Sequence, residues 1–284
     1  MIRQDYNLKN CFYQMIKKKQ LSFMGDIYFV TMGDQSQTPS TWSKIFGNQY
    51  KEISLAEPMQ YTETIAKQTN DRLRELPSVD FIRIDTAQHG LGFLSSIKDM
   101  IGPKGTLGIE INLSFFESDL DDFNQYSAID HVLKPLGFIL FDMNIQKEPR
   151  KTLSYNLDDV YKQVPGPVQS ATALYFRDLG DTDYEKKFNF IPDKNHLIKL
   201  ACLLDIYDFG DCTAELIINH QKTLKVNDLE KTALLDHLTP PLHGKKLSYS
   251  IYINKFEKDP KKWFPKTTTT SKIKSFIRGI ITCQ

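Results

Sequence analysis

The sequence predicts an α/β fold built on a parallel sheet, and one stretch carries most of this prediction. Residues 79–85 alternate apolar and polar side chains and end in the carboxylate of Asp85, while residues 106–112 form a second apolar run with a polar end. Residues 90–97, between the two runs, have the pattern of a helix. A helix between two strands is the usual connection of a parallel pair, and such crossovers are almost always right-handed.

Length and composition bound the class of protein. The 284 residues allow one large domain or two small ones, and 40% hydrophobic with 12% aromatic residues can form a substantial core. With 36 basic and 35 acidic residues the net charge is only +1, so the composition gives no case for nucleic-acid binding.

Several features lead us to expect a cytoplasmic protein. The first residues, through Lys17–Lys19, lack the apolar block of a signal peptide, and no apolar stretch approaches the ~20 residues of a membrane span. Four cysteines in a chain of this length, with no close pair, do not form a disulfide scaffold and instead suit a reducing compartment. They are Cys11, Cys202, Cys212 and Cys283.

The chain before the central stretch begins with a polar, basic segment, residues 1–24, which we expect to be an arm or a helix. Its lysine run is either a solvated helix end or a contact for an acidic partner. Residues 26–31 and 52–56 are rich in β-branched and aromatic side chains and predict two strands. A short helix to Phe46 separates them, and a polar helix to about Leu76 follows the second.

This front portion has the outline of a nucleotide site. A strand, Gly33, a helix and Glu57 follow one another, and in such sites an acidic residue binds the ribose hydroxyls. A phosphate or adenosyl loop usually has two or three glycines, because residues without a side chain let the backbone approach the ligand. Only one glycine stands at this place here.

After the central stretch the pattern predicts a helix over residues 121–133 and strands over 138–142 and 171–178. A long polar excursion, residues 148–167, joins the two strands without a convincing crossover helix. We therefore expect an antiparallel pair at the edge of the sheet.

The C-terminal region is expected to be mainly helical from residue 194, with a short strand at 248–254. Thr267–Thr270 form a spacer, and a basic amphipathic helix follows it. That helix either lies on a membrane surface or docks a protein partner, or it packs on its own domain. We therefore expect four segments: an N-terminal arm or helix (1–24), an α/β domain (25–192), a helical C-terminal region (193–265), and the spacer with the basic helix (266–284).

The ends of the predicted parallel strands give the candidate site. In α/β sheets ligands collect beyond the carboxyl ends of the strands, which places Asp85, His89, Glu110 and Asn112 on one rim. The alternative is that the acidic residues only cap loops where strands end.

Two cysteines and two histidines of the C-terminal region could be drawn as a metal site, but their spacing fits no known ligand pattern. We therefore expect the cysteines to lie in the core and the histidines on the surface. The four residues are His196, Cys202, Cys212 and His220.

Four segments in order resemble the later part of the FkbM-type methyltransferase family. The family has a strand that ends in Ile-Asp, a second short strand, a Gly-Phe-x-Leu-Phe-Asp strand and an Ala-Leu-Tyr-x-Arg-Asp strand. The corresponding segments here are 79–85, 107–111, 137–142 and 173–178. The resemblance implies a class I, Rossmann-like methyltransferase sheet with an antiparallel edge hairpin, S-adenosylmethionine as the donor and a hydroxyl group as the acceptor.

The resemblance transfers few site residues. Asp85 matches the end of the family's first strand, but the Gln/Glu-Gly-x-Glu that follows in the family is Ala87-Gln88-His89-Gly90 here. The family's Asp-Val-Gly-Ala-Asn donor loop is absent, and Glu57-Pro58 stands for its Glu-Pro. We therefore expect a truncated sheet whose donor-binding first half is missing or degenerate.

Two hypotheses follow from the residues and the resemblance. In the first, the chain is an O-methyltransferase in which Asp85 acts as a base or orients the acceptor, His89 and Glu110 lie nearby and Glu57 contacts the donor. In the second, it is a non-catalytic descendant that serves as a binding or assembly module. Donor binding separates the two.

Overall fold

The computed structural model describes residues 11–19, 21, 23–33, 40–55, 63–86, 88–102, 105–115, 124–148 and 166–260. The chain divides into two compact units, Met1–Asn227 and Asp228–Gln284. None of the four segments expected from the sequence begins or ends at this boundary, and they stay a prediction.

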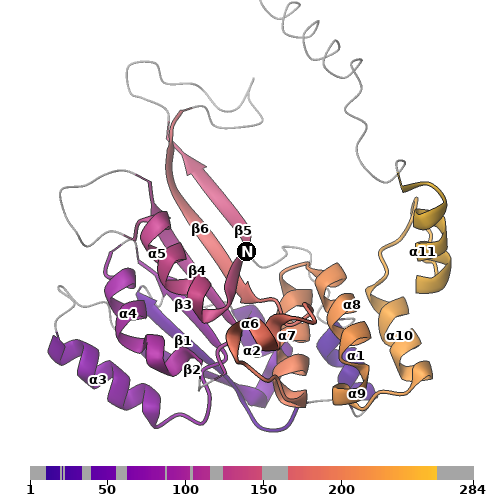
Figure 1. Cartoon of the computed structure of the whole chain (residues 1–284), viewed down its shortest axis with the longest axis horizontal. Helices are drawn as coiled ribbons and strands as arrows, with labels where there is room; N and C mark the ends of the chain where they lie inside the picture. Colours follow the sequence, from indigo (N-terminus) through magenta and orange to yellow (C-terminus); the bar gives the residue numbers. More distant parts are fainter. Residues whose placement is uncertain are drawn as a thin grey trace, which may run out of the picture. The chain divides into compact units, whose positions relative to one another are not determined.

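Strands and helices alternate through most of the first unit (Figure 1). In chain order its elements are α1 (Phe12–Lys18), β1 (Ile27–Gly33), α2 (Ser40–Phe46), η3 (Gly47–Gln49), β2 (Tyr50–Leu55), α3 (Glu63–Arg74), β3 (Phe81–Asp85), α4 (Gly90–Ile101), β4 (Gly108–Ser114), α5 (Tyr126–Leu133), η4 (Lys134–Leu136), β5 (Phe138–Lys147), β6 (Val168–Arg177), α6 (Tyr184–Phe188), α7 (Lys194–Ile206), α8 (Gly210–Asn219) and α9 (Gln221–Leu224).

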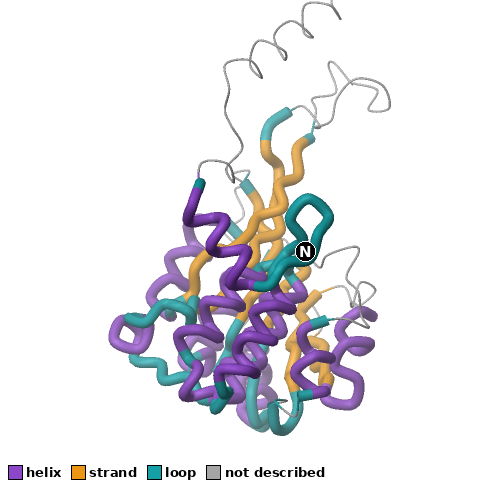
Figure 2. Tube along the Cα trace, turned by 90° about the vertical axis from the view of Figure 1, so that its right-hand side faces the viewer, coloured by secondary structure: helices purple, strands orange, loops and turns teal. Residues whose placement is uncertain are grey.

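The strands form one sheet of six in the order β2-β1-β3-β4-β6-β5. β1 pairs in parallel with β2 and β3, and β3 with β4, whereas β6 is antiparallel to both β4 and β5. This confirms the predicted α/β class, a Rossmann-like and mainly parallel sheet with an antiparallel hairpin at one edge. The hairpin strands are longer than expected and extend past the other strands (Figures 1 and 2).

The order in which the chain adds strands to the sheet reverses at β1. After β1 the chain adds β2 on one side, and it then returns to place β3 on the other side. Such a topological switch point is where open α/β sheets bind ligands, outside the carboxyl ends of the strands. β1 and β2 thus form a parallel pair ahead of the central stretch, and the expectation of a degenerate donor-binding half stays a prediction.

One face of the sheet is apolar along its whole length. Ile82, Ile84, Ile109 and Ile111 are fully buried there against helices α3, α4 and α5, which cover this face (Figure 1). Burial of four such side chains contributes several kcal/mol, at roughly 1.5–3 kcal/mol for each.

The opposite face carries aromatic rings at the amino ends of the strands. Phe29 lies 4.5 Å from Trp42 of α2, and Phe81 lies 5.9 Å from Tyr207, just after α7, by ring centroids. Gly108 leaves room for them, because a Cβ there would lie 2.4 Å from the ring of Phe176.

A buried ion pair ties α7 to the amino end of β3. The Nζ atom of Lys199 lies 2.8 Å from Oδ1 of Asp80, and both residues are buried. Asp80 also accepts hydrogen bonds from the backbone N–H of Tyr28 and the hydroxyl of Ser78. Because its charge is matched and its oxygens are bonded, this carboxylate is stable out of water.

The second unit contains α10 (Asp228–Leu238) and α11 (Tyr249–Lys258). The strand expected at 248–254 is wrong, because this segment starts α11. The carboxylate of Asp236 accepts the backbone N–H of Tyr249 at 2.7 Å. The described part of this unit contains no strand to pair with, and a helix satisfies its backbone locally.

No helix within the described residues is long and apolar enough to span a bilayer. The Thr-rich spacer and the basic helix expected in residues 266–284 lie outside the described residues, so their roles stay predictions.

Candidate functional site

The switch point brings the ends of β1 and β3 together. Gly33, the last residue of β1, lies opposite Asp85, the last residue of β3. Gly33 has a φ of 115°, and a Cβ at this position would lie 2.7 Å from the carbonyl oxygen of Asp85. Only glycine combines that conformation with so close an approach.

The carboxylate of Asp85 is held from two sides. Its Oδ2 lies 3.0 Å from Nη2 of Arg83, and its Oδ1 accepts the side-chain amide of Asn112 at 2.9 Å. Asn112 accepts in turn from the hydroxyl of Thr172 at 2.8 Å. The side chain of Asp85 is still 19% exposed, and each carboxylate oxygen has a second lone pair, so it can accept a further hydrogen bond.

Glu110 belongs to the same network but lies deeper. It is opposite Arg83 within the sheet, and Nε of Arg83 lies 3.3 Å from its Oε1. Its Oε2 accepts the hydroxyl of Tyr207 at 3.1 Å. Burial, followed by the nearby Glu110 carboxylate, raises the pKa of Tyr207 well above its ordinary value. Tyr207 therefore stays protonated and donates to Glu110 at neutral pH.

The turn after β3 is closed by Asn124. Its side-chain amide donates to the carbonyls of Thr86 and Asn112, and its Oδ1 accepts the backbone N–H of Leu91 in the first turn of α4. His89 is buried in this turn with a φ of 60°, as the residue that precedes α4. Asn124 thus gives the first turn of α4, from a distant part of the chain, the kind of hydrogen bond that an N-cap side chain usually accepts.

The face that carries the aromatic rings changes character toward the carboxyl ends of the strands. Of the two rows of paired residues that follow the aromatic row on this face, the first is polar apart from Leu174 and the second is polar apart from Gly33. We call this region the polar half-face. Its members used below are Thr31, Arg83, Asp85, Glu110, Asn112, Thr172, Asp142 and Asn144.

A second carboxylate network lies on β2, next to the polar half-face. Glu52 accepts the hydroxyl of Thr31 at 2.9 Å and the hydroxyl of Tyr50 at 3.0 Å. Burial, with Glu52 as the second cause, raises the pKa of Tyr50 above its ordinary value. The polar side chains are therefore joined to one another rather than isolated on each strand.

The structure brings together three of the four rim residues predicted from the sequence. Asp85 and Asn112 are hydrogen-bonded, and Glu110 joins them through Arg83, while His89 lies in the turn before α4. Glu57 lies outside the described residues. The proposed chemical roles of all these residues stay predictions.

The sequence did not predict roles for Arg83, Tyr207 or Asn124. Arg83 had a usable signal, because it lies two residues before Asp85 in an alternating strand and so must share its face. The sequence holds no comparable signal for Tyr207 or Asn124, because each reaches the site from a separate part of the chain.

Metal binding has no support in the described part of the chain, where no group of three or more His, Cys, Asp or Glu side chains could hold an ion.

Burial raises the pKa of the Cys212 thiol to about 12, so this thiol is protonated at neutral pH. The buried Cys202 thiol has its pKa raised by the same cause.

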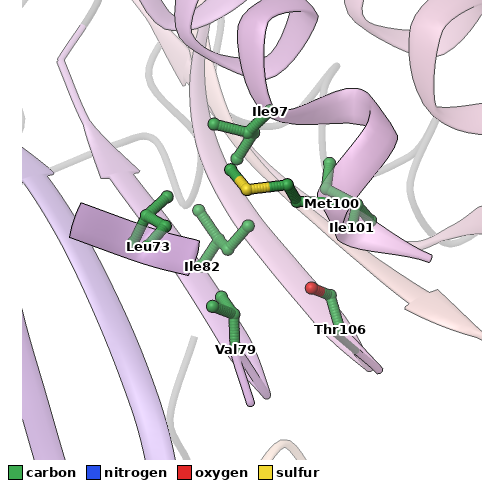
Figure 3. Close-up of a pocket in the computed structure, with 7 residues that line it drawn as sticks. All are labelled: Leu73, Val79, Ile82, Ile97, Met100, Ile101 and Thr106. Atoms are coloured by element: carbon green, nitrogen blue, oxygen red, sulfur yellow. The ribbon is translucent and has the colours of Figure 1, made fainter. Parts of the chain in front are cut away.

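Two pockets lie away from the switch point. One, beneath α4, has a volume of about 10 Å³, which is room for about one water molecule (Figure 3). It is apolar except for Thr106. The other lies between α1 and α2, with a volume of about 320 Å³, and Lys17 and Lys44 are among its lining residues.

Comparisons with known proteins add little. No known family's profile matches the chain, and no curated protein matches it. One similar solved structure is a protein-(glutamine-N5) methyltransferase (release factor-specific) from Alicyclobacillus acidocaldarius. Its identity is 9%, the TM-score is 0.26, and the match covers 59% of this chain and 91% of that one. At this distance no function is carried over from it.

Proposed function

We propose that this chain is an S-adenosylmethionine-dependent methyltransferase of the FkbM type and that it methylates a hydroxyl group. The observation that carries the proposal is the switch point, where Gly33 ends β1 directly against Asp85. The four sequence segments that resemble the FkbM family include the strand that supplies Asp85.

The described residues suit such a donor in two respects. Gly33 ends β1 without a side chain, which lets the ends of β1 and β3 lie directly against each other at the switch point. Two carboxylates, those of Asp85 and Glu110, lie within ion-pair distance of the single guanidinium of Arg83, and a sulfonium is a cation that the excess negative charge attracts. Glu57, which follows β2, remains the predicted partner of the ribose hydroxyls.

Within this proposal Asp85 orients the acceptor. When bound, S-adenosylmethionine supplies a methyl group on positively charged sulfur. As a carboxylate, Asp85 only accepts hydrogen bonds, and an acceptor hydroxyl can donate to it and lose its proton there. Arg83 and Asn112 fix the carboxylate, so the hydroxyl is held in one direction.

The alternative is a non-catalytic binding module, and one observation favours it. Each carboxylate oxygen of Asp85 and Glu110 already accepts a hydrogen bond from the chain or lies within an ion pair. A module that has lost catalysis would keep this network for stability. Donor binding without methyl transfer to any hydroxyl acceptor would favour this second function.

Calorimetric titration with S-adenosylmethionine tests the donor site. We expect the wild type to bind and Gly33→Ala to bind roughly tenfold more weakly, about 1.4 kcal/mol, because the new Cβ displaces Asp85. Gly25→Ala is the matched control, since Gly25 also has a positive φ but open space around it. A flat wild-type titration with folded protein would overturn the proposal.

A further inference from the structure

The pocket between α1 and α2 has no part in the function proposed above. Its volume of about 320 Å³ lies at the lower end of the range for small-molecule sites. Gly47–Gln49, which line it, lead directly into the first residue of β2, and that residue pairs with the first residue of β1. The pocket thus lies toward the amino ends of the parallel strands, whereas Gly33 and Asp85 are at the carboxyl ends.

One part of the lining consists of buried side chains that the chain itself holds in place. Tyr13, Ile45 and Phe46 are each 2% exposed, and the rings of Tyr13 and Phe46 meet edge to face with centroids 5.0 Å apart. The hydroxyl of Tyr13 donates to Oε1 of Gln49, whose Nε2 donates to the carbonyl of Gly25 at 2.7 Å. Because these groups are fixed before a ligand arrives, binding requires little ordering of them.

The remaining polar side chains of the lining are available to a ligand. They are Gln14, Lys17, Lys44 and Asn48. Within the described part of the chain, no hydrogen bond or ion pair engages any of these four side chains. The lysine ammonium groups only donate hydrogen bonds, while the two amides both donate and accept. The described residues that line the pocket include no carboxylate.

The elements around the pocket carry positive charge only. Residues 11–19 and 40–49 contain four lysines and no aspartate or glutamate, in a chain whose 36 basic and 35 acidic residues nearly balance. Lys17 and Lys44 each lie in the last turn of a helix, where a cation is favourable by itself. That local preference does not account for two ammonium groups that line one cavity, because like charges repel until an anion lies between them.

Two ammonium groups without a carboxylate match a ligand with two negative charges. A phosphate monoester carries about −1.5 to −2 charges at neutral pH and has three strong acceptor oxygens, whereas a carboxylate carries a single charge. Hydrogen bonds from ammonium groups to phosphate oxygens are of the strong, charge-assisted kind. The amides of Gln14 and Asn48 then remain for hydroxyl groups on the rest of the ligand.

We propose that this pocket binds a compact phosphate monoester that carries hydroxyl groups, of the chemistry of a sugar phosphate. Lys17 and Lys44 hold the phosphate, and the amides of Gln14 and Asn48 bind the hydroxyl groups. The site lies apart from the switch point, so the proposal does not depend on the methyltransferase function.

Calorimetry of the full chain tests the charge of the ligand. Glucose 6-phosphate, glucuronate and glucose share a sugar ring and carry about two, one and no negative charges. We expect glucose 6-phosphate to bind roughly tenfold more tightly than glucuronate, glucose to show no binding, and added salt to weaken the phosphate. Equal binding of glucose 6-phosphate and glucuronate, or no binding of glucose 6-phosphate, would overturn the proposal.

Inorganic phosphate tests the hydroxyl groups. We expect it to bind more weakly than glucose 6-phosphate, because it leaves the amides of Gln14 and Asn48 without a partner from the ligand. Inorganic phosphate that binds as tightly as glucose 6-phosphate would show that the pocket recognises an anion alone, and the assignment to a sugar phosphate would be wrong.

A matched set of variants locates the site. Lys17→Gln and Lys44→Gln each remove one exposed charge from the lining, and we expect each to weaken binding of glucose 6-phosphate roughly two- to fivefold. Lys18→Gln removes an exposed charge from the next position of α1, outside the lining, and should leave binding unchanged. If Lys18→Gln weakens binding as much as the other two, the general charge of α1 holds the ligand and the location is wrong.

This proposal and the methyltransferase function fail separately. If glucose 6-phosphate binds and S-adenosylmethionine does not, the methyltransferase function is wrong and the phosphate site stands. If only the donor binds, the phosphate site is wrong and the donor site stands. Saturating S-adenosylmethionine should not displace glucose 6-phosphate, and displacement would contradict a site at the opposite ends of the strands.

Discussion

One face of the sheet has an aromatic half and a polar half, and the change from one to the other takes only two residues along each strand. Phe29 and Phe81, near the amino ends of β1 and β3, lie close to Phe176, near the carboxyl end of the antiparallel β6, and rings from α2 and from Tyr207 after α7 pack over them. One row further on the side chains opposite one another include Arg83 and Glu110. The same strands thus form a packed core at one end and a polar surface at the other.

This difference separates stability from function within one face. The aromatic half is closed, because its rings fill the space between the sheet and the helices. The polar half is linked by hydrogen bonds and ion pairs but is not sealed. Substitutions in the first half should therefore change the free energy of unfolding, and substitutions in the second should mainly change binding.

The largest expected effect is the loss of an aromatic ring. Phe81→Ala removes a side chain that is 1% exposed and contacts rings from both helices, so we expect unfolding to become about 3–5 kcal/mol easier. Asn144→Ala, on the exposed end of the polar half-face, should change stability by less than about 0.5 kcal/mol. Urea denaturation measures both, and similar losses would erase the distinction between the halves.

The alternation that produces this face could be predicted from the sequence. Apolar and polar residues alternate over 82–85, so the strand, its parallel partner and the position of Asp85 at its end followed from local pattern. The long-range contacts did not, because Tyr207 meets Glu110 across 97 positions of the chain.

The error at α11 has a similar origin. Ser248, Ser250, Tyr252 and Asn254 alternate with Tyr and Ile residues as in a strand, yet the segment is a helix that begins with Ser248 as its N-cap residue. A strand needs a neighbour to bond its backbone, and the described part of the second unit offers none. The local pattern contains no information about the missing neighbour.

A smaller effect is expected where the two halves meet, at Tyr207. Tyr207→Phe removes the hydroxyl that donates to Glu110, and we expect a loss of about 1.5–3 kcal/mol at neutral pH, as for a hydrogen bond to a charged group. Tyr126→Phe, whose ring stacks on Phe115, is the control and should change little.

The Tyr207 effect should depend on pH. Burial and Glu110 raise the pKa of Tyr207 in the folded state, so the folded chain releases this proton less readily than the unfolded chain. Stability from the neutral hydroxyl is thus complete below about pH 10 and is lost as pH rises further. The advantage of the wild type over Tyr207→Phe should shrink above about pH 10. A constant difference across that range would contradict the assigned role.

The smallest effect compares two threonines on opposite faces. Thr106 is fully buried beneath α4, and its hydroxyl has no hydrogen-bond partner (Figure 3). Thr172, in the polar half-face, donates to Asn112 at 2.8 Å. Valine replaces either hydroxyl with a methyl group of similar shape. We expect Thr106→Val to stabilise the fold by about 1 kcal/mol, because an unbonded polar group leaves the core.

Thr172→Val should have the opposite sign, with a loss of about 1 kcal/mol, because Asn112 loses a donor and the carboxylate of Asp85 loses part of its support. Thermal unfolding of the two variants, in the same buffer, gives the comparison directly. If both substitutions shift stability in the same direction, the hydroxyl of Thr106 has a partner or that of Thr172 does not contribute, and the contrast between the faces is weaker than the geometry indicates. Opposite signs would show that the effect of the same substitution on stability depends on its surroundings, which are apolar at Thr106 and hydrogen-bonded at Thr172.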